Sequence, residues 1–323
     1  MRIGFDLGGT KMLAAVLDDE RRIVARNKNK TTGMDNDGIF AQIRETIAGV
    51  LEKAEISQSE IESVGIAAPG PIDMATGTIL STPNLGLKDF ALSARLGDAL
   101  GCPVYLENDV NAGLWGEFVS GVAQDHRHVI GIFPGTGIGG GIIMNGELFR
   151  GKNGSAGEIG HITVQSDGRR CGCGNHGCLE TVASKTAIAR DLAILAMNGQ
   201  SPVLAEAGAT DIKLVKSGLI KKALDAGDFG VAAVINQAAY FLGIGMASMV
   251  NTFDPELIVL GGGLVEKLGS QFTDTAERTM RERSMPRLVA DVAVVEAQLG
   301  DDAAVVGAAD LADRKHGGEV SAR

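Results

Sequence analysis

Short apolar segments alternate with turns along the first third of the chain, and one longer segment is amphipathic. Between residues 38 and 54, Ile39, Ile43, Ile47 and Val50 recur at spacings of three and four, which places them on one face of a helix. The shorter apolar segments are bounded by turn residues and predict strands. The predicted strands lie at 2–6, 12–17, 23–27, 63–68 and 104–106, and a further helix is predicted at 110–118.

The pattern restarts near residue 129. An apolar segment at 129–133 is followed by a glycine-rich turn at 135–141 and a second apolar segment at 142–144. The start of the chain has the same order, with a glycine turn at 8–11 between two strands. This repetition suggests two related α/β halves that face one cleft.

The second half of the chain is predicted to be mostly helical. The stretch 231–253 is the most apolar, but it carries Asn236 and Gln237 and is interrupted by glycines. We therefore expect a buried core helix there rather than a membrane span. A buried strand at 257–260 leads into a glycine triplet at 261–263. The predicted helices lie at 179–197, 212–226, 231–251 and 301–314.

Composition and charge narrow the class of protein. With 323 residues the chain is too long for one typical core, so two domains are expected. The net charge of -10 argues against a nucleic-acid partner held through its phosphates. The N-terminus lacks the shape of a signal peptide, and the cysteines imply no disulfide framework. A cytoplasmic location without membrane association is therefore expected.

Three of the four cysteines lie within eight positions. Cys171, Cys173 and Cys178 are separated by glycines, so their thiolates can converge on one zinc ion. The spacing leaves the fourth ligand open between His161, ten residues upstream, and His176, which would need a very tight loop. Four protein ligands leave no open position for catalysis, so the zinc would be structural.

Two glycine turns are candidate phosphate sites. Gly135-x-Gly137-x-x-Gly140 formally matches a dinucleotide fingerprint, but a strand rather than a helix is predicted after it, so we reject that interpretation. No Gly-x4-Gly-Lys-Ser/Thr motif is present. Thr10, Lys11 and Thr136 accompany the two turns, whose backbone amides can hold phosphate oxygens.

These motifs together form a set that resembles the ROK family of sugar kinases and repressors, and within it most closely the bacterial glucokinases. The resemblance covers residues 3 to about 309, and the motif positions are all intact. The motifs are Asp6-x-Gly-Gly-Thr-Lys, the second glycine turn, Glu107-x-Asp109-x-x-Ala112, Gly154-Ser-Ala-Gly157-Glu158-Ile-Gly-His161 and Cys171-x-Cys173-Gly-x-x-Gly-Cys178-x-Glu180.

The resemblance implies an α/β fold of the actin-like ATPase type, related to hexokinase and ribonuclease H, with two related domains around a cleft. The small domain would comprise residues 1–117 and 302–323, and residues 118–301 would form a large domain with the zinc site. The implied reaction is ATP-dependent phosphorylation of an aldohexose at its 6-hydroxyl, with glucose as the expected substrate. The implied cofactors are ATP, Mg²⁺ and structural zinc, and a homo-oligomer, dimer or tetramer, is expected.

The family pattern also assigns roles to individual residues. Asp109 matches the catalytic base, Asp6 is implied to act on Mg²⁺ through water, and His161 is the favoured fourth zinc ligand. The sugar would be bound by Gly70, Asn84, Asn108, Asp109, Glu158, His161 and Glu180. ATP would be bound by Asp6, Gly8, Gly9, Thr10, Lys11, Gly135, Thr136, Gly137, Gly262 and Gly263.

Other functions are possible within the same family. The same site could serve a kinase for N-acetylglucosamine, N-acetylmannosamine or fructose, because the sequence does not show the size of the pocket near the sugar's 2-position. A sugar-sensing repressor would carry an N-terminal winged-helix domain, for which a motif at Asp6 leaves no room. An inactive sugar binder is disfavoured by the intact Asp109 and glycine turns.

Overall fold

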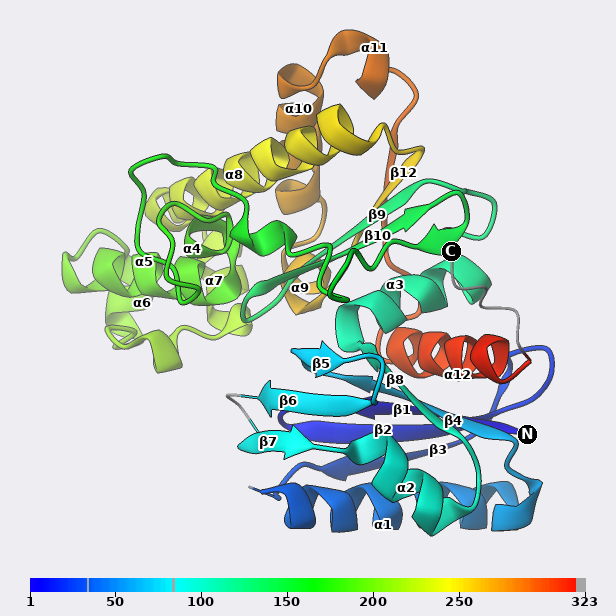
Figure 1. Ribbon diagram of the computed structural model, residues 1–323. Coiled ribbons are helices and arrows are strands. Elements are labelled where there is room, and N and C mark those ends of the chain that lie inside the picture. Colours follow the sequence, from blue (N-terminus) through cyan, green and yellow to red (C-terminus); the bar gives the residue numbers. More distant parts are fainter. Residues whose placement is uncertain (34, 83–84, 318–323) are drawn as a thin grey trace. The chain divides into compact units, whose positions relative to one another are not determined.

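The computed structural model describes residues 1–33, 35–82 and 85–317, and it divides into two compact units (Figure 1). The first unit contains Met1–Asp125, Leu148–Ala156 and the C-terminal segment from Gln298. The second unit contains His126–Glu147 and Gly157–Ala297. The domain boundaries near 117 and 301 remain a prediction about which segments fold together.

The first unit is built on a five-stranded sheet with the order β3-β2-β1-β4-β8. β1 pairs antiparallel with β2, whereas β1, β4 and β8 are mutually parallel. Because parallel strands end at the same edge, the C-terminal ends of β1 and β8 lie at one edge of the sheet with β4 between them. The strands are β1 (Arg2–Leu7), β2 (Lys11–Leu17), β3 (Ile23–Lys30), β4 (Ser63–Ala68) and β8 (Val104–Asn108).

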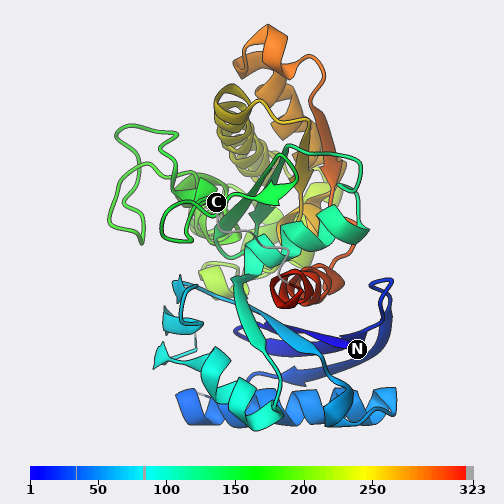
Figure 2. The same ribbon diagram turned by 45° about the vertical axis from the view of Figure 1, so that its right-hand side comes forward.

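Helices cover both faces of this sheet (Figure 1). α1 (Asn36–Ala54) and α2 (Leu92–Leu100) lie on one face, and α3 (Asp109–Ser120) packs with α12 (Asp302–His316) on the other. Figure 2 shows the blue α1 and the red α12 on opposite sides of the sheet. α12 approaches β4 very closely. A Cβ built on Gly65 would lie only 1.8 Å from the Ala308 carbonyl oxygen. Only glycine at position 65 permits this contact.

A small antiparallel sheet that the sequence did not predict completes the first unit. It contains β5 (Ile72–Asp73), β6 (Thr78–Thr82) and β7 (Leu87–Phe90) in that order. A 3-10 turn, η1 (Gln58–Glu60), precedes β4. These elements were missed because they are short and their apolar positions are few.

The second unit repeats the sheet topology of the first. Its order is β11-β10-β9-β12-β13, with β9 antiparallel to β10 and parallel to β12, which is parallel to β13. The internal repetition predicted from the apolar pattern is therefore confirmed. The strands are β9 (Val129–Pro134), β10 (Ile138–Met144), β11 (Glu147–Leu148), β12 (Leu257–Leu260) and β13 (Ala293–Glu296).

Helices supply most of the core of the second unit. Side chains of α5, α8 and α10 pack together with those of β9, β10 and β12. The helices are η2 (Ile159–His161), α4 (Glu180–Ala183), α5 (Lys185–Met197), α6 (Pro202–Glu206), η3 (Ile212–Leu214), α7 (Ser217–Asp225), α8 (Phe229–Phe253), α9 (Gly263–Leu268), α10 (Ser270–Arg283) and α11 (Pro286–Val289).

Three predicted boundaries were wrong. The helix predicted at 179–197 is interrupted at Ser184, whose hydroxyl accepts a hydrogen bond from the Ala187 N–H and begins α5. The helix predicted at 212–226 is a 3-10 turn followed by the shorter α7. The second glycine turn is also shorter than predicted, because β10 already begins at Ile138.

α8 is the one helix in the described residues that is long and apolar enough to cross a membrane. Half of its most apolar window is buried inside the structure. Ile235, Leu242 and Met246 belong to the core of the second unit. For this face of α8, the predicted role as a core helix is confirmed.

Candidate active site and metal site

Asp109 lies at the junction between β8 and α3. Asn108 is the N-cap of α3, and its side-chain oxygen accepts hydrogen bonds from the N–H groups of Val110 at 3.0 Å and Asn111 at 3.2 Å. Asn108, rather than Asp109, is thus the N-cap of α3. The Asp109 carboxylate also accepts a hydrogen bond from the Val110 N–H at 2.9 Å.

Gly70 lies beside this junction. A Cβ built on Gly70 would be 3.9 Å from the side-chain nitrogen of Asn108. The Asn108 oxygen is occupied by the cap, so its NH₂ group is the part that faces Gly70. The structure therefore brings together three predicted sugar-binding residues, Gly70, Asn108 and Asp109. A fourth, Asn84, lies outside the described residues.

Glu107 is a residue whose importance sequence reasoning missed. In the sequence it stands out only as the first residue of the Asp109 motif. In the structure its side chain is buried. Its carboxylate accepts hydrogen bonds from the Asn108 N–H at 3.1 Å, the Asn111 side chain at 3.2 Å and Arg150 at 2.8 Å. A buried carboxylate with three donors organises the backbone around it.

Asp6, at the end of β1, lies in the same electrostatic environment as Asp109. Burial raises the pKa of Asp6 to about 7, and the negative charge of Asp109 adds to this shift. Lys11 opposes the shift, and Asp301 contributes in the same direction as Asp109. A buried carboxylate whose ionisation is also disfavoured by a neighbouring negative charge gains from a bound cation.

The raised pKa predicts a pH-dependent stability. The pKa of Asp6 is about 7 in the folded protein and 3.8 ordinarily. The stability that the protonated Asp6 carboxyl contributes is therefore present at low pH and is lost as the pH rises through 7. Without nucleotide or metal, we expect the unfolding free energy of the wild type to fall relative to Asp6→Asn between pH 5 and 8, by at most about 1.4 kcal/mol per pH unit. Urea denaturation at several pH values measures this difference. Parallel stability curves for the two proteins would contradict it.

The first glycine turn, Gly8 to Lys11, joins β1 to β2. The carbonyl oxygens of Gly8 and Thr10 accept hydrogen bonds from Thr31, from its hydroxyl at 2.7 Å and from its N–H at 3.0 Å. The Lys11 amine is 2.6 Å from Asp301. Because Thr31 binds two of its carbonyl oxygens, the turn has a defined backbone conformation, and Lys11 lies at its end.

The second glycine turn is held by the start of the helical region after it. The Glu180 carboxylate accepts a hydrogen bond from the Ile138 N–H at 2.9 Å. A Cβ at Gly137 would lie 2.2 Å from the same carboxylate oxygen, so any side chain there would displace the Glu180 carboxylate from the turn. The Thr186 hydroxyl donates to the Thr136 carbonyl at 2.7 Å. β10 follows this turn, so the prediction of a strand rather than a helix after it is confirmed.

The glycine triplet lies close to the second turn. Gly262 has a φ of 85° and precedes α9, and a Cβ there would be 2.9 Å from the carbonyl oxygen of Pro134. Pro134 immediately precedes Gly135. The structure thus places the predicted nucleotide residues of the second unit next to one another.

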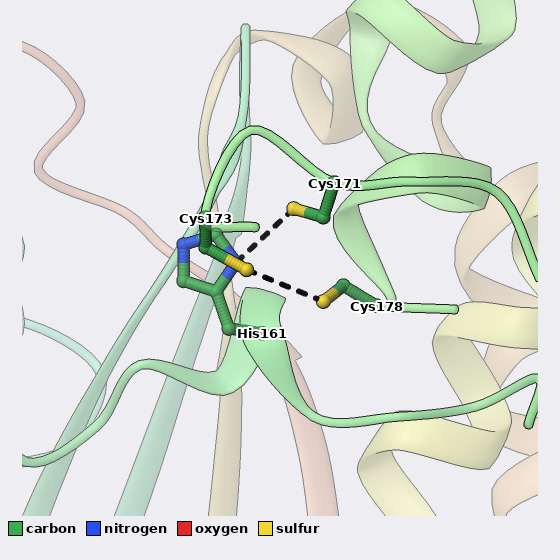
Figure 3. A group of neighbouring side chains, drawn as sticks. All are labelled: His161, Cys171, Cys173 and Cys178. Carbon is green, nitrogen blue, oxygen red and sulfur yellow. Dashed lines mark hydrogen bonds between the residues drawn. The ribbon is translucent and has the colours of Figure 1, made fainter. Parts of the chain in front are cut away.

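His161 and the three clustered cysteines converge in the second unit (Figure 3). Their potential ligand atoms all lie within 4.8 Å of one another, and His176 is not in the group. The Nδ1 atom of His161 is 3.5 Å from the Cys171 sulfur, and the Cys173 and Cys178 sulfurs are 3.7 Å apart. Burial, with hydrogen bonds from the neighbouring cysteines, raises the pKa of Cys178 to about 12. A thiolate at Cys178 therefore requires a nearby cation, as zinc would be.

His161 faces two groups with its two ring nitrogens. Nδ1 points to the cysteine cluster, and Nε2 lies 3.9 Å from the exposed carboxylate of Glu158. Glu180 begins α4 two residues after Cys178. The cysteine cluster thus includes one predicted sugar-binding residue, His161, and is followed closely in the chain by another, Glu180.

Comparison with known proteins identifies the family of this chain. The model of the ROK family matches residues 2–315. The chain belongs to the ROK family. A glucokinase of Halalkalibacterium halodurans is 36% identical over 315 residues, which cover 94% of this chain and 92% of the relative.

Two solved ROK structures have the same fold. The Streptomyces griseus ROK glucokinase in complex with glucose and AMPPNP is 36% identical, with a TM-score of 0.80 over 97% of this chain and 99% of its own. The ROK hexokinase of Thermus thermophilus is 32% identical, with a TM-score of 0.82 over 97% of this chain and 98% of its own. The predicted actin-like ATPase fold of this ROK sugar kinase is confirmed.

Proposed function

We propose that this chain transfers the γ-phosphoryl group of ATP to the 6-hydroxyl of glucose. The observation that carries the proposal is the position of Asp109 in the first turn of α3, with Asn108 as the cap and with Asp6 in its electrostatic environment. Sugar phosphorylation needs a base for the hydroxyl proton and a means of holding the phosphoryl group in line. Asp109 would be this base.

The sugar would be bound by carboxylates, amides and backbone, which suit a ring of hydroxyls that each donate and accept. Asn108 would donate through its NH₂ group, because its oxygen caps α3. His161 would contact the sugar through Nε2 while Nδ1 faces the cysteines. The complete proposed set is Gly70, Asn84, Asn108, Asp109, Glu158, His161 and Glu180.

ATP would be held by the two glycine turns and the glycine triplet. The amides of Gly8, Gly9 and Thr10, with Lys11, and those of Gly135, Thr136 and Gly137 would receive phosphate oxygens. Gly262 and Gly263 would lie against the nucleoside. Asp6 would hold Mg²⁺ through water, and the raised pKa of Asp6 supports a cation there. When bound, Mg²⁺ would neutralise the negative charge of the ATP phosphates.

We propose zinc at His161, Cys171, Cys173 and Cys178 with a structural role. This donor set suits tetrahedral zinc, and the atoms lie within 4.8 Å of one another. The ion would fix the segments that carry Glu158 and Glu180, and it would thereby give sugar binding a rigid support. A homo-oligomer and a cytoplasmic location are further parts of this proposal.

A coupled assay of ADP release over a panel of sugars tests the proposed function. We expect the highest kcat/KM with glucose, and a rate near background when Mg²⁺ is omitted, because the phosphate charge is then not neutralised. A higher kcat/KM with N-acetylglucosamine, N-acetylmannosamine or fructose would retain the kinase class and replace the substrate. No stimulation by any sugar would overturn the kinase activity itself.

A further inference from the structure

One segment of the chain changes units twice within ten residues. The chain leaves the second unit at Glu147, residues Leu148–Ala156 group with the first unit, and the chain returns to the second unit at Gly157. We call residues 148–156 the strap. Its ends are drawn together by a hydrogen bond from the Ala156 N–H to the Arg150 carbonyl at 3.0 Å. The next residue but one, Glu158, belongs to the proposed sugar site.

Arg150 anchors the strap to the strand that carries the catalytic junction. Its Nε donates to the Glu107 carboxylate at 2.8 Å. The Glu107 side chain is 3% exposed and that of Arg150 is 24% exposed, so the pair is largely shielded from water. A shielded ion pair between rigid elements resists displacement more than a surface pair does.

The hydrogen bonds of Glu107 link Arg150 to residues on either side of Asp109. One carboxylate oxygen binds Arg150, and the other accepts from the Asn108 N–H and the Asn111 side chain. Asn108 in turn caps the helix in which Asp109 is the first residue. Through Glu107, Arg150 is thus linked to the Asn108 backbone before Asp109 and to the Asn111 side chain after it.

Lys315 of α12 also interacts electrostatically with this buried carboxylate. Burial lowers the pKa of Lys315, the charge of Glu107 raises it, and the charge of Arg150 lowers it. Glu107 therefore interacts with two cations, and Arg150 donates a hydrogen bond to it. Glu107 is therefore the anion at this junction, and the hydrogen bond from Arg150 sets the orientation of its carboxylate.

We propose that Arg150 is a positioning residue for phosphoryl transfer, which acts on Asp109 through Glu107. The proposal rests on the kinase function proposed above. Arg150 aligns the base by fixing the Glu107 carboxylate, and it thereby ties the strap to the β8–α3 junction. ATP binding does not depend on it, because none of the proposed nucleotide residues lies in this chain of hydrogen bonds.

The test compares Arg150→Met, Arg150→Lys, Glu107→Gln and the double variant Arg150→Met/Glu107→Gln with the wild type. For Arg150→Met we expect kcat to fall about 10- to 100-fold, because a small misplacement of a catalytic group is costly. KM for ATP should stay within about twofold of the wild type, because Arg150 takes no part in nucleotide binding. Arg150→Lys should recover part of the lost rate, since the amine can still reach Glu107 as a single donor.

The double variant decides whether Arg150 acts through Glu107. If it does, Arg150→Met should add little to the effect of Glu107→Gln, because coupled residues are not additive. Fully additive losses would overturn the proposal. Each protein is assayed well below its own unfolding midpoint, so that loss of folded protein does not lower kcat.

Arg2→Met provides the matched control. Arg2 forms an ion pair with Asp313 at 2.8 Å in the same unit and is 17% exposed, but it lies at the start of β1. Its loss should lower stability and leave kcat unchanged. An Arg150→Met enzyme with wild-type kcat, in a preparation whose wild type phosphorylates glucose, would overturn the inference. A wild type without sugar kinase activity would instead overturn the proposed function.

Discussion

Replacing Asp109 by asparagine is expected to lower kcat about 10²- to 10⁴-fold, which is the usual effect of losing a general base. Asparagine has nearly the same shape and can still hydrogen bond, so glucose affinity should change far less. The N-cap of α3 is supplied by Asn108, and the helix should therefore remain folded. Steady-state kinetics with glucose and ATP, together with a glucose-binding titration, separate the two effects.

Asp98→Asn serves as the control for this prediction. Asp98 is an exposed residue of α2 in the same unit, and the chemical change is identical. Its kcat should match that of the wild type. If Asp109→Asn also keeps near-normal turnover, Asp109 is not the base, and another group must accept the proton of the sugar hydroxyl.

Replacing Cys173 by alanine is expected to remove the zinc and to weaken the enzyme in two ways. One ligand of four would be lost, and the buried thiol of Cys178 would be left without the cation that its ionised form requires. Stability should fall because metal binding and local folding are linked. Sugar affinity should fall as well, because the loop connects Glu158 and His161 to Glu180.

Two histidine variants identify the fourth ligand. His161→Ala should lose zinc like Cys173→Ala, whereas His176→Ala should retain about one zinc per chain, as a structural site does. His176 lies outside the cluster, and its Nδ1 is 3.2 Å from the Gly168 carbonyl oxygen. Elemental analysis of the purified variants measures this directly. Full zinc in His161→Ala with loss in His176→Ala would assign the fourth ligand to His176.

The strands were the most predictable part of this protein. The predicted strands at 63–68 and 257–260 coincide with β4 and β12, all of whose residues are buried. A parallel strand covered on both faces is a continuous apolar run, which is visible without knowledge of its neighbours. The repeated strand–turn–strand pattern likewise predicted two sheets of related topology.

Elements with few apolar residues were not predicted. α10 is rich in charged residues, and Phe272, Ala276 and Met280 are its buried apolar positions. The sheet of β5, β6 and β7 has strands of only two to five residues. Their stability comes from packing against other segments, which a local pattern does not record.

The chemistry of the site was only partly predictable. Spacing selected the three cysteines, whereas the sugar kinase activity and the roles of Asp109 and Asp6 were implied by the resemblance of the motifs to the ROK family. Spacing did not decide between His161 and His176, because either can be brought to the cysteines by a suitable loop. The fold brings His161 beside Cys171, and it places the Glu180 carboxylate against the second glycine turn.

The Arg150–Glu107 pair depends on the tertiary structure alone. Hydrophobic periodicity records which face of a segment is buried, and that is a local property of the sequence. The partner of a buried carboxylate is instead set by the segments that the folded chain brings within hydrogen-bonding distance. Glu107 and Arg150 are 43 positions apart, and no spacing rule connects two residues across such a separation.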